Sequence, residues 1–116
     1  MARQYTRLAD IQYIGSTAAS IYTNAASTKS YIKSLVLFNS NTTSETVRLY
    51  NVPNSGAALG TAGTSNQFAE ITLATLETLM FDMPYPMTII DEYDSIQAST
   101  TTANKVTVQI LGDKDV

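Results

Sequence analysis

The sequence predicts an all-β protein, folded as an antiparallel two-sheet β-sandwich of jelly-roll-like form with seven or eight short strands. Three observations favour this fold. Turn-forming clusters separate short alternating segments at intervals of roughly ten residues. Seventeen threonines and eleven serines fit a pleated surface better than a helix. The 116 residues, 44% hydrophobic and 15% charged, suit one folded domain and are too apolar for disorder.

Residues 1–17 are predicted to be either an N-terminal arm or the first strand, and residues 18–116 a single β-sandwich domain. Polar and apolar side chains alternate from Arg3 to Ile14, and Gly15 begins a break in the pattern. An extended arm would add to the sheet edge of a neighbouring subunit. The alternatives are the first strand of the chain's own sandwich and a frayed tail.

Three strands are expected early in the domain, at 18–24, 31–39 and 45–52. The middle one is apolar on both faces towards its end, which is typical of a central strand. The turn cluster at 39–44 predicts that the second and third strands form a hairpin. In the middle strand, the alternation places on one shared face Ile32, Ser34, Val36 and Phe38.

A glycine-rich stretch follows. Residues 53–65 hold three of the five glycines and begin with Pro53, which has no backbone N–H for a sheet ladder. We expect a mobile, exposed loop that makes contacts. Strands are expected next at 66–73 and 78–83, although the spacing within 71–80 also permits a helix. The expected core side chains of this region are Phe68, Ile71, Leu73, Leu76, Leu79 and Phe81.

The remaining segments are short. Pro84 and Pro86 predict an extended or turning link. The acidic residues 91–94 predict a turn. Strands are expected at 87–90, 95–99 and 105–112, followed by a charged, frayed end at 113–116.

The residue inventory argues against most catalytic chemistry. The chain has no cysteine and no histidine, which excludes disulfides, thiolate zinc sites and a Ser-His-Asp triad. Asp91, Glu92 and Asp94 offer oxygen ligands, but their spacing matches no calcium loop, so a solvated turn is expected. The glycines form no phosphate-binding motif. We therefore expect no catalytic residue, no metal, no cofactor and no enzymatic activity.

Charge and hydropathy limit the classes of partner that this chain is expected to bind. The formal net charge of −3 and the lack of a basic run argue against nucleic acid. No apolar stretch approaches the roughly 18 residues that cross a bilayer, so no membrane is expected. The N-terminus lacks the apolar core of a secretory signal, which predicts synthesis in the cytoplasm. Seven tyrosines provide area with a polar tip, which suits protein interfaces.

The strand and turn pattern resembles that of small virion proteins of tailed bacteriophages. The likeness lies in residues 19–23, 31–39, 47–50 and 94–99, followed by the alternating strand at the end. One departure is 25–28, Ala-Ala-Ser-Thr, where similar chains often carry a Pro-Ala-Gly turn. The resemblance implies a β-sandwich built into the phage particle, as capsid decoration or as a tail or baseplate component.

The resulting hypothesis is a non-enzymatic virion structural protein that is made in the host cytoplasm. Its expected role is a capsid decoration or cement protein that binds the major capsid protein, or other virion proteins, in the assembled shell. The resemblance implies a homo-oligomer, with a trimer the commonest arrangement. The alternatives are a tail or baseplate component and a glycan-binding module that uses tyrosines and the 91–94 turn. The expected contact residues are Arg3, Tyr5, Arg7, Tyr13, Pro53, Asn54, Leu59 and Asn66.

Overall fold

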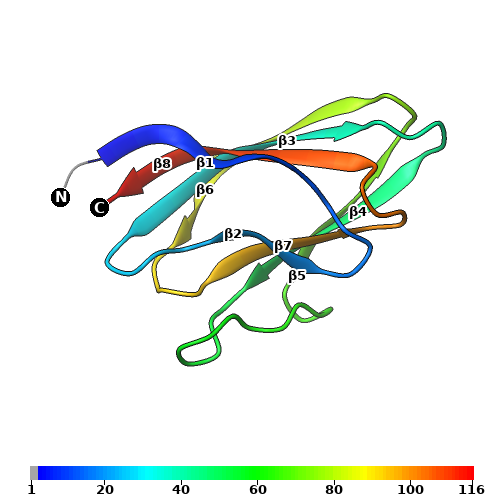
Figure 1. The fold of residues 1–116 in the computed structure, drawn as a ribbon. Helices are drawn as coiled ribbons and strands as arrows, with labels where there is room; N and C mark the ends of the chain where they lie inside the picture. The colour runs from blue at the N-terminus through cyan, green and yellow to red at the C-terminus, as the bar shows by residue number, and fades with distance from the viewer. Residues whose placement is uncertain (1–2) are drawn as a thin grey trace.

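Two antiparallel four-stranded sheets pack face to face in the computed structural model, which confirms the β-sandwich (Figure 1). The structure describes residues 3–116, and the side chains from residue 7 onward. No helix occurs within this range. The eight strands are β1 (Arg3–Tyr13), β2 (Ala19–Thr23), β3 (Lys29–Asn39), β4 (Glu45–Val52), β5 (Gln67–Leu73), β6 (Thr78–Ile89), β7 (Ser95–Thr100) and β8 (Val106–Asp115).

The strand order is that of a jelly roll. The first sheet has the order β1-β8-β3-β6, and the second sheet has the order β2-β7-β4-β5. Strands β1, β2, β3 and β4 therefore pair with β8, β7, β6 and β5 respectively, as in one long hairpin rolled up on itself. The segment between β4 and β5 is the tip of that hairpin. Residues 3–13 form the edge strand β1 of the first sheet.

The core lies between the two sheets and is aliphatic. Alternation in β8 buries Val106, Val108 and Ile110, as the sequence predicts, and the second sheet buries Leu49 and Ile96 from the other side. Leu73 is fully buried, whereas Leu76 is 65% exposed in a turn with φ of 58°. The prediction that Leu76 lies in the core is therefore wrong. The turn between β5 and β6 carries it out of the sheet.

The predicted hairpin of 31–39 with 45–52 is also wrong. Strand β3 pairs with β6 and β8 in the first sheet, whereas β4 pairs with β5 and β7 in the second. The fully buried Asn39 stabilises the turn by which the chain passes from the first sheet to the second. Its side-chain amide donates to the carbonyls of Thr43, Leu73 and Ala74, and its side-chain oxygen accepts the N–H of Asn41. A polar turn signal marks a reversal but does not say which sheet the chain enters next.

A β-bulge in β3 changes which residues face the core. The register with β6 and with β8 shifts between Ile32 and Ser34. Beyond the shift, Leu35 and Leu37 are completely buried, while Val36 and Phe38 are only partly buried. The predicted shared face of Ile32, Val36 and Phe38 is therefore wrong, because a bulge moves every later side chain to the opposite face.

The link at the two prolines is extended, one of the two predicted alternatives, but it does not separate two strands. Strand β6 runs through Pro84 and Pro86, joining the predicted segments 78–83 and 87–90. Ile32 of β3 pairs with Met87 of β6, and Ser34 pairs with Asp82. Two residues along β3 therefore correspond to five along β6, and residues 83–86 have no partner in β3. Because β6 is an edge strand, a proline here removes no ladder hydrogen bond from a second neighbour. Tyr85, between the prolines, is 87% exposed.

Strand β8 also continues further than predicted. Residues 113–115 of the expected frayed end pair on both sides, with Asp113 opposite Tyr31 of β3 and opposite Tyr5 of β1. Asp113 is buried and forms a 2.9 Å ion pair with Lys33. A central position with a neighbouring strand on each side keeps this charged segment extended.

Candidate assembly interface

The two outer faces of the sandwich differ in what covers them. On the second sheet, residues 53–66 fold back over β7 (Figure 1), and the side-chain amide of Gln97 donates to the carbonyl of Gly60 at 3.1 Å. Tyr50 and Val52 are buried but do not belong to the core between the sheets. A Cβ at Gly60 would lie 2.9 Å from Cγ1 of Val52, so the loop packs closely on this strand. The chain therefore covers part of this face itself.

The rest of the second sheet's outer face is polar. Arg48 on β4 and Glu70 on β5 lie opposite each other and form a 2.8 Å ion pair. The neighbouring pair, Thr46 and Thr72, brings two hydroxyls together. Charged and hydroxyl side chains of this kind are well solvated on an open sheet face.

The first sheet presents a different outer face, which the strand register defines row by row. Residues directly opposite each other on neighbouring strands point to the same side. From β1 to β6, the first row is Tyr13, Thr107, Phe38 and Thr78. The second row, from β8 to β6, is Gln109, Val36 and Met80. The third row is Arg7, Leu111, Ser34 and Asp82.

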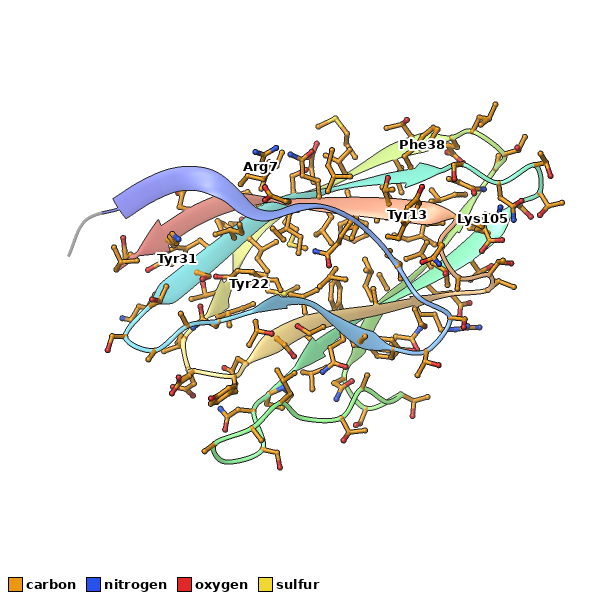
Figure 2. The ribbon with its side chains drawn as sticks, in the orientation of Figure 1. Arg7, Tyr13, Tyr22, Tyr31, Phe38 and Lys105 are labelled. Atoms are coloured by element: carbon orange, nitrogen blue, oxygen red, sulfur yellow. The ribbon has the colours of Figure 1, made fainter. Side chains whose placement is uncertain are left out.

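Much of this surface is apolar and open to solvent. Tyr13 and Met80 are each 58% exposed, and Ile11 on β1 is 63% exposed. Between them, Val36, Phe38 and Leu111 are partly buried. Figure 2 shows Phe38 and Arg7 on the side of the first sheet that faces away from the second. We call this surface the apolar face, formed by Ile11, Tyr13, Val36, Phe38, Met80 and Leu111.

Charge lies around the apolar face, at Arg7 and Asp82 on its two edge strands and in the Lys33–Asp113 ion pair at one end of β3 and β8. Arg7 on β1 forms a 2.9 Å ion pair with Asp10, and both side chains are more than half exposed. Asp82 on β6, at the other end of the same row, is exposed. Between them the Ser34 hydroxyl is buried with no hydrogen-bond partner among the described residues. A sheet face with an apolar centre and charges at its rim has the composition of a protein interface.

The predicted contact residues divide between opposite sides of the sandwich. Arg7 and Tyr13 lie on the side of the apolar face, whereas Leu59, 43% exposed, lies in the loop that covers the second sheet. The backbones of Arg3 and Tyr5 pair with β8, and their side chains lie outside the described residues. The structure therefore does not bring the two predicted regions together.

The other predicted loop residues hold the loop in place. Asn54 donates to the carboxylate of Asp94, and Pro53 beside it is exposed. The side chain of Asn66 accepts the N–H of Gly63 and donates to the carbonyl of Thr61. These asparagines hydrogen-bond within the loop or to the neighbouring turn, and Leu59 is the large apolar side chain that the loop exposes.

Sequence reasoning missed Val36, Phe38 and Met80 as surface residues. The uninterrupted period of two placed Val36 and Phe38 on the face of buried Ile32, and only the bulge at residue 33 turns them outward. Met80 lies opposite Val36 and shares its side of the sheet. A charged residue at position 33, in the middle of an apolar strand, is the signal that could have indicated a bulge.

The acidic turn at 91–94 is occupied by the chain's own donors. One oxygen of Asp94 accepts the backbone and side-chain N–H groups of Asn54, and the other accepts the N–H of Asp91. Among the side chains of residues 7–116, the structure holds no group of three acidic residues arranged for a metal ion, and no pocket. None of the described segments is a helix that could cross a bilayer.

Glu45 is the buried acid whose ionisation is perturbed. It lies at the start of β4, where one oxygen accepts the N–H of Thr102 and the other accepts the Asn41 amide, both at 2.8 Å. Burial alone would raise the pKa of this carboxyl. The hydrogen bonds from Thr102 and Asn41, together with the charge of Lys105, outweigh burial and hold its pKa below 4.5. Glu45 therefore joins the turn between β3 and β4 to the turn between β7 and β8 as a carboxylate.

Comparison with known proteins adds little to this geometry. No protein-family model matches the sequence, and no curated protein matches it. One similar solved structure is described as the structure of infectious bursal disease virus Gt strain. The two chains are 11% identical with a TM-score of 0.34, and the alignment covers 97% of this chain and 30% of that chain. This chain thus spans about a third of the length of that one, and the similarity assigns neither a family nor a function.

Proposed function

We propose that this protein is a non-enzymatic structural component of a virus particle, and specifically a capsid decoration or cement protein of a tailed bacteriophage. The observation that supports it is the open apolar face of the first sheet, on a sandwich whose other outer face is partly covered by its own loop and otherwise polar. Such a face exposes apolar area to water in the free protein, and a partner that covers it removes this area from water, which is favourable.

The fold supports this proposal by analogy alone. Eight-stranded jelly rolls occur in viral capsid proteins, and also in lectins and cupins, so the fold does not distinguish these classes. The apolar face favours a protein partner. It is a broad surface spread over four strands, and its central side chains carry no charge.

Two contact surfaces on opposite sides would suit a cement protein. The apolar face lies on the first sheet, while Leu59 lies in the loop over the second. A subunit of this shape can contact two neighbours at once. If the contact with capsid subunits exists only in an assembled shell, binding stabilises the shell by mass action, and the effect increases with the concentration of free subunit.

Co-sedimentation tests the proposal. We expect the purified protein to pellet with undecorated phage shells and to remain in the supernatant with disassembled capsid subunits. Leu59→Ser should weaken the binding to shells, whereas Glu92→Gln, a change in an exposed turn, should leave it unchanged. Failure of the wild type to pellet with shells would remove the cement role, and labelling confined to the tail tip would assign the protein to the tail.

A further inference from the structure

We propose that the apolar face is occupied by a second copy of this chain, packed sheet against sheet about a two-fold axis. This inference uses the proposed function only in treating the apolar face as an assembly surface. It concerns a contact between two copies of one chain, which can be measured without any capsid.

Charge complementarity is the first argument. Arg7 and Asp82 occupy opposite ends of one row that crosses all four strands of the first sheet. Consider a two-fold axis that is parallel to the strands and passes between β8 and β3. Rotation about this axis places the same row of the second copy opposite this row, in the reverse order. Each Arg7 then faces Asp82 of the other copy, so one operation creates two opposite-charge pairs. A two-fold interface requires this kind of self-complementary patch.

Arg7 can enter this pair while it keeps its ion pair with Asp10. Its Nε already contacts Asp10 at 2.9 Å, and a guanidinium has five N–H groups that can serve two carboxylates. Asp82 is exposed and pairs with no cation within residues 7–116.

The same two-fold rotation also places the uncharged rows of the two copies against each other. In the second row, Val36 faces Gln109 of the other copy, and Met80 faces the β1 side, where Ile11 is exposed. In the first row, Phe38 faces Thr107 and Tyr13 faces Thr78. The centre of the contact is therefore uncharged, and the charges lie at the rim, as in stable protein interfaces.

The available area is sufficient for a dimer. The whole outer face of the first sheet, four strands about 4.8 Å apart and about ten residues long at 3.3 Å per residue, measures roughly 600 Å², of which the three rows of the apolar face are about half. Two copies that cover the whole face, including the end with Lys33 and Asp113, would bury about 1,200 Å² in total, which is the lower end of the range for specific, stable complexes. The edges of the first sheet do not favour assembly by strand pairing, since β1 is bulged and β6 carries Pro84 and Pro86.

Sedimentation equilibrium on the full chain tests this arrangement. We expect a monomer–dimer equilibrium for the wild type at micromolar concentrations. Arg7→Glu and Asp82→Lys should each weaken dimerisation about tenfold or more, because each creates two like-charge contacts. The double variant should restore most of the wild-type affinity, since it re-forms both pairs with the charges exchanged. Glu92→Lys is the matched control and should not change the dimer.

Each possible result either supports or contradicts the proposed dimer. A wild type that stays monomeric at roughly 100 μM, well above the micromolar dissociation constants of weak interfaces near the standard size, would overturn the proposal. So would a trimer, single variants without effect, or a double variant that stays as weak as the single ones. Circular dichroism checks that each variant folds, and Met80→Lys, at an exposed position, provides a second disruption should Arg7→Glu fail that check. Dimerisation without shell binding would remove the proposed function alone, and shell binding by a monomer would remove this inference alone.

Discussion

Asn54 donates both its backbone N–H and its side-chain amide to the same carboxylate oxygen of Asp94, each at 2.8 Å, across 40 residues of sequence. This pair ties the first residues of the long loop between β4 and β5 to the turn between β6 and β7. Because Asp94 accepts these hydrogen bonds, water is not the sole partner of its carboxylate in the acidic turn. The carboxylate of Asp94 serves the packing of the loop over the second sheet.

Removing this carboxylate should release the loop. Asp94→Ala leaves two donors of Asn54 without their acceptor, and we expect a loss of about 1–3 kcal/mol in the free energy of unfolding. Limited proteolysis should then cut within residues 53–66 faster than in the wild type. Asp91→Ala is the matched control, because the described interactions of Asp91 use its backbone. Equal cleavage of the two variants would contradict this role.

Two glycines of the same loop form a natural comparison. A Cβ at Gly60 would collide with the carbonyl oxygen of Pro53 and lie 2.9 Å from Val52, whereas a Cβ at Gly63 would meet nothing within 4 Å. We expect Gly60→Ala to cost about 1–3 kcal/mol, because backbone must move. Gly63→Ala should stay within about 0.5 kcal/mol of the wild type. Urea denaturation followed by circular dichroism measures both, and equal midpoints would show that the loop does not pack on β4.

The crossing from β3 to β4 should depend on Asn39. Asn39→Ala leaves the buried carbonyl of Leu73 and the partly buried carbonyl of Ala74 without their donor, and removes the acceptor for the N–H of Asn41. We expect a loss of about 2–4 kcal/mol, or failure to fold. Asn51→Ala, an exposed position, should change stability by less than about 0.5 kcal/mol. Thermal unfolding of the two variants distinguishes these outcomes, and a tolerant Asn39→Ala would mean that the turn forms without this side chain.

Glu45 should make stability depend on acid pH. Because its pKa is lower in the folded chain than the 4.5 of an ordinary glutamate, its contribution is fully present above pH 4.5. The contribution is lost as the pH falls through the folded pKa, where the native carboxylate takes up a proton. Urea titrations between pH 3 and 7 should show a steeper loss of stability at acid pH for the wild type than for Glu45→Gln. Parallel pH profiles for the two proteins would contradict this assignment.

The fold class and most strand positions could be predicted because they depend on local patterns. The alternation of Val106, Val108 and Ile110 reports one buried face, and β8 buries that face as expected. The glycine-rich segment from 53 marked the tip of the rolled hairpin. The contact residues were less predictable. Arg7 and Tyr13 reach the apolar face because β1 pairs with β8, a partner about a hundred residues further along the chain.

The sequence by itself determined that this protein is built from short strands with an aliphatic core, since period-two alternation and turn residues act over a few neighbouring positions. The tertiary structure alone decided which sheet each strand joins and which side chains remain outside. Pro84 and Pro86 can lie within β6 because it is an edge, and Val36 and Phe38 face solvent because of one bulge. These features depend on strand pairing between distant segments, and a local pattern contains no information about which partner a strand will meet.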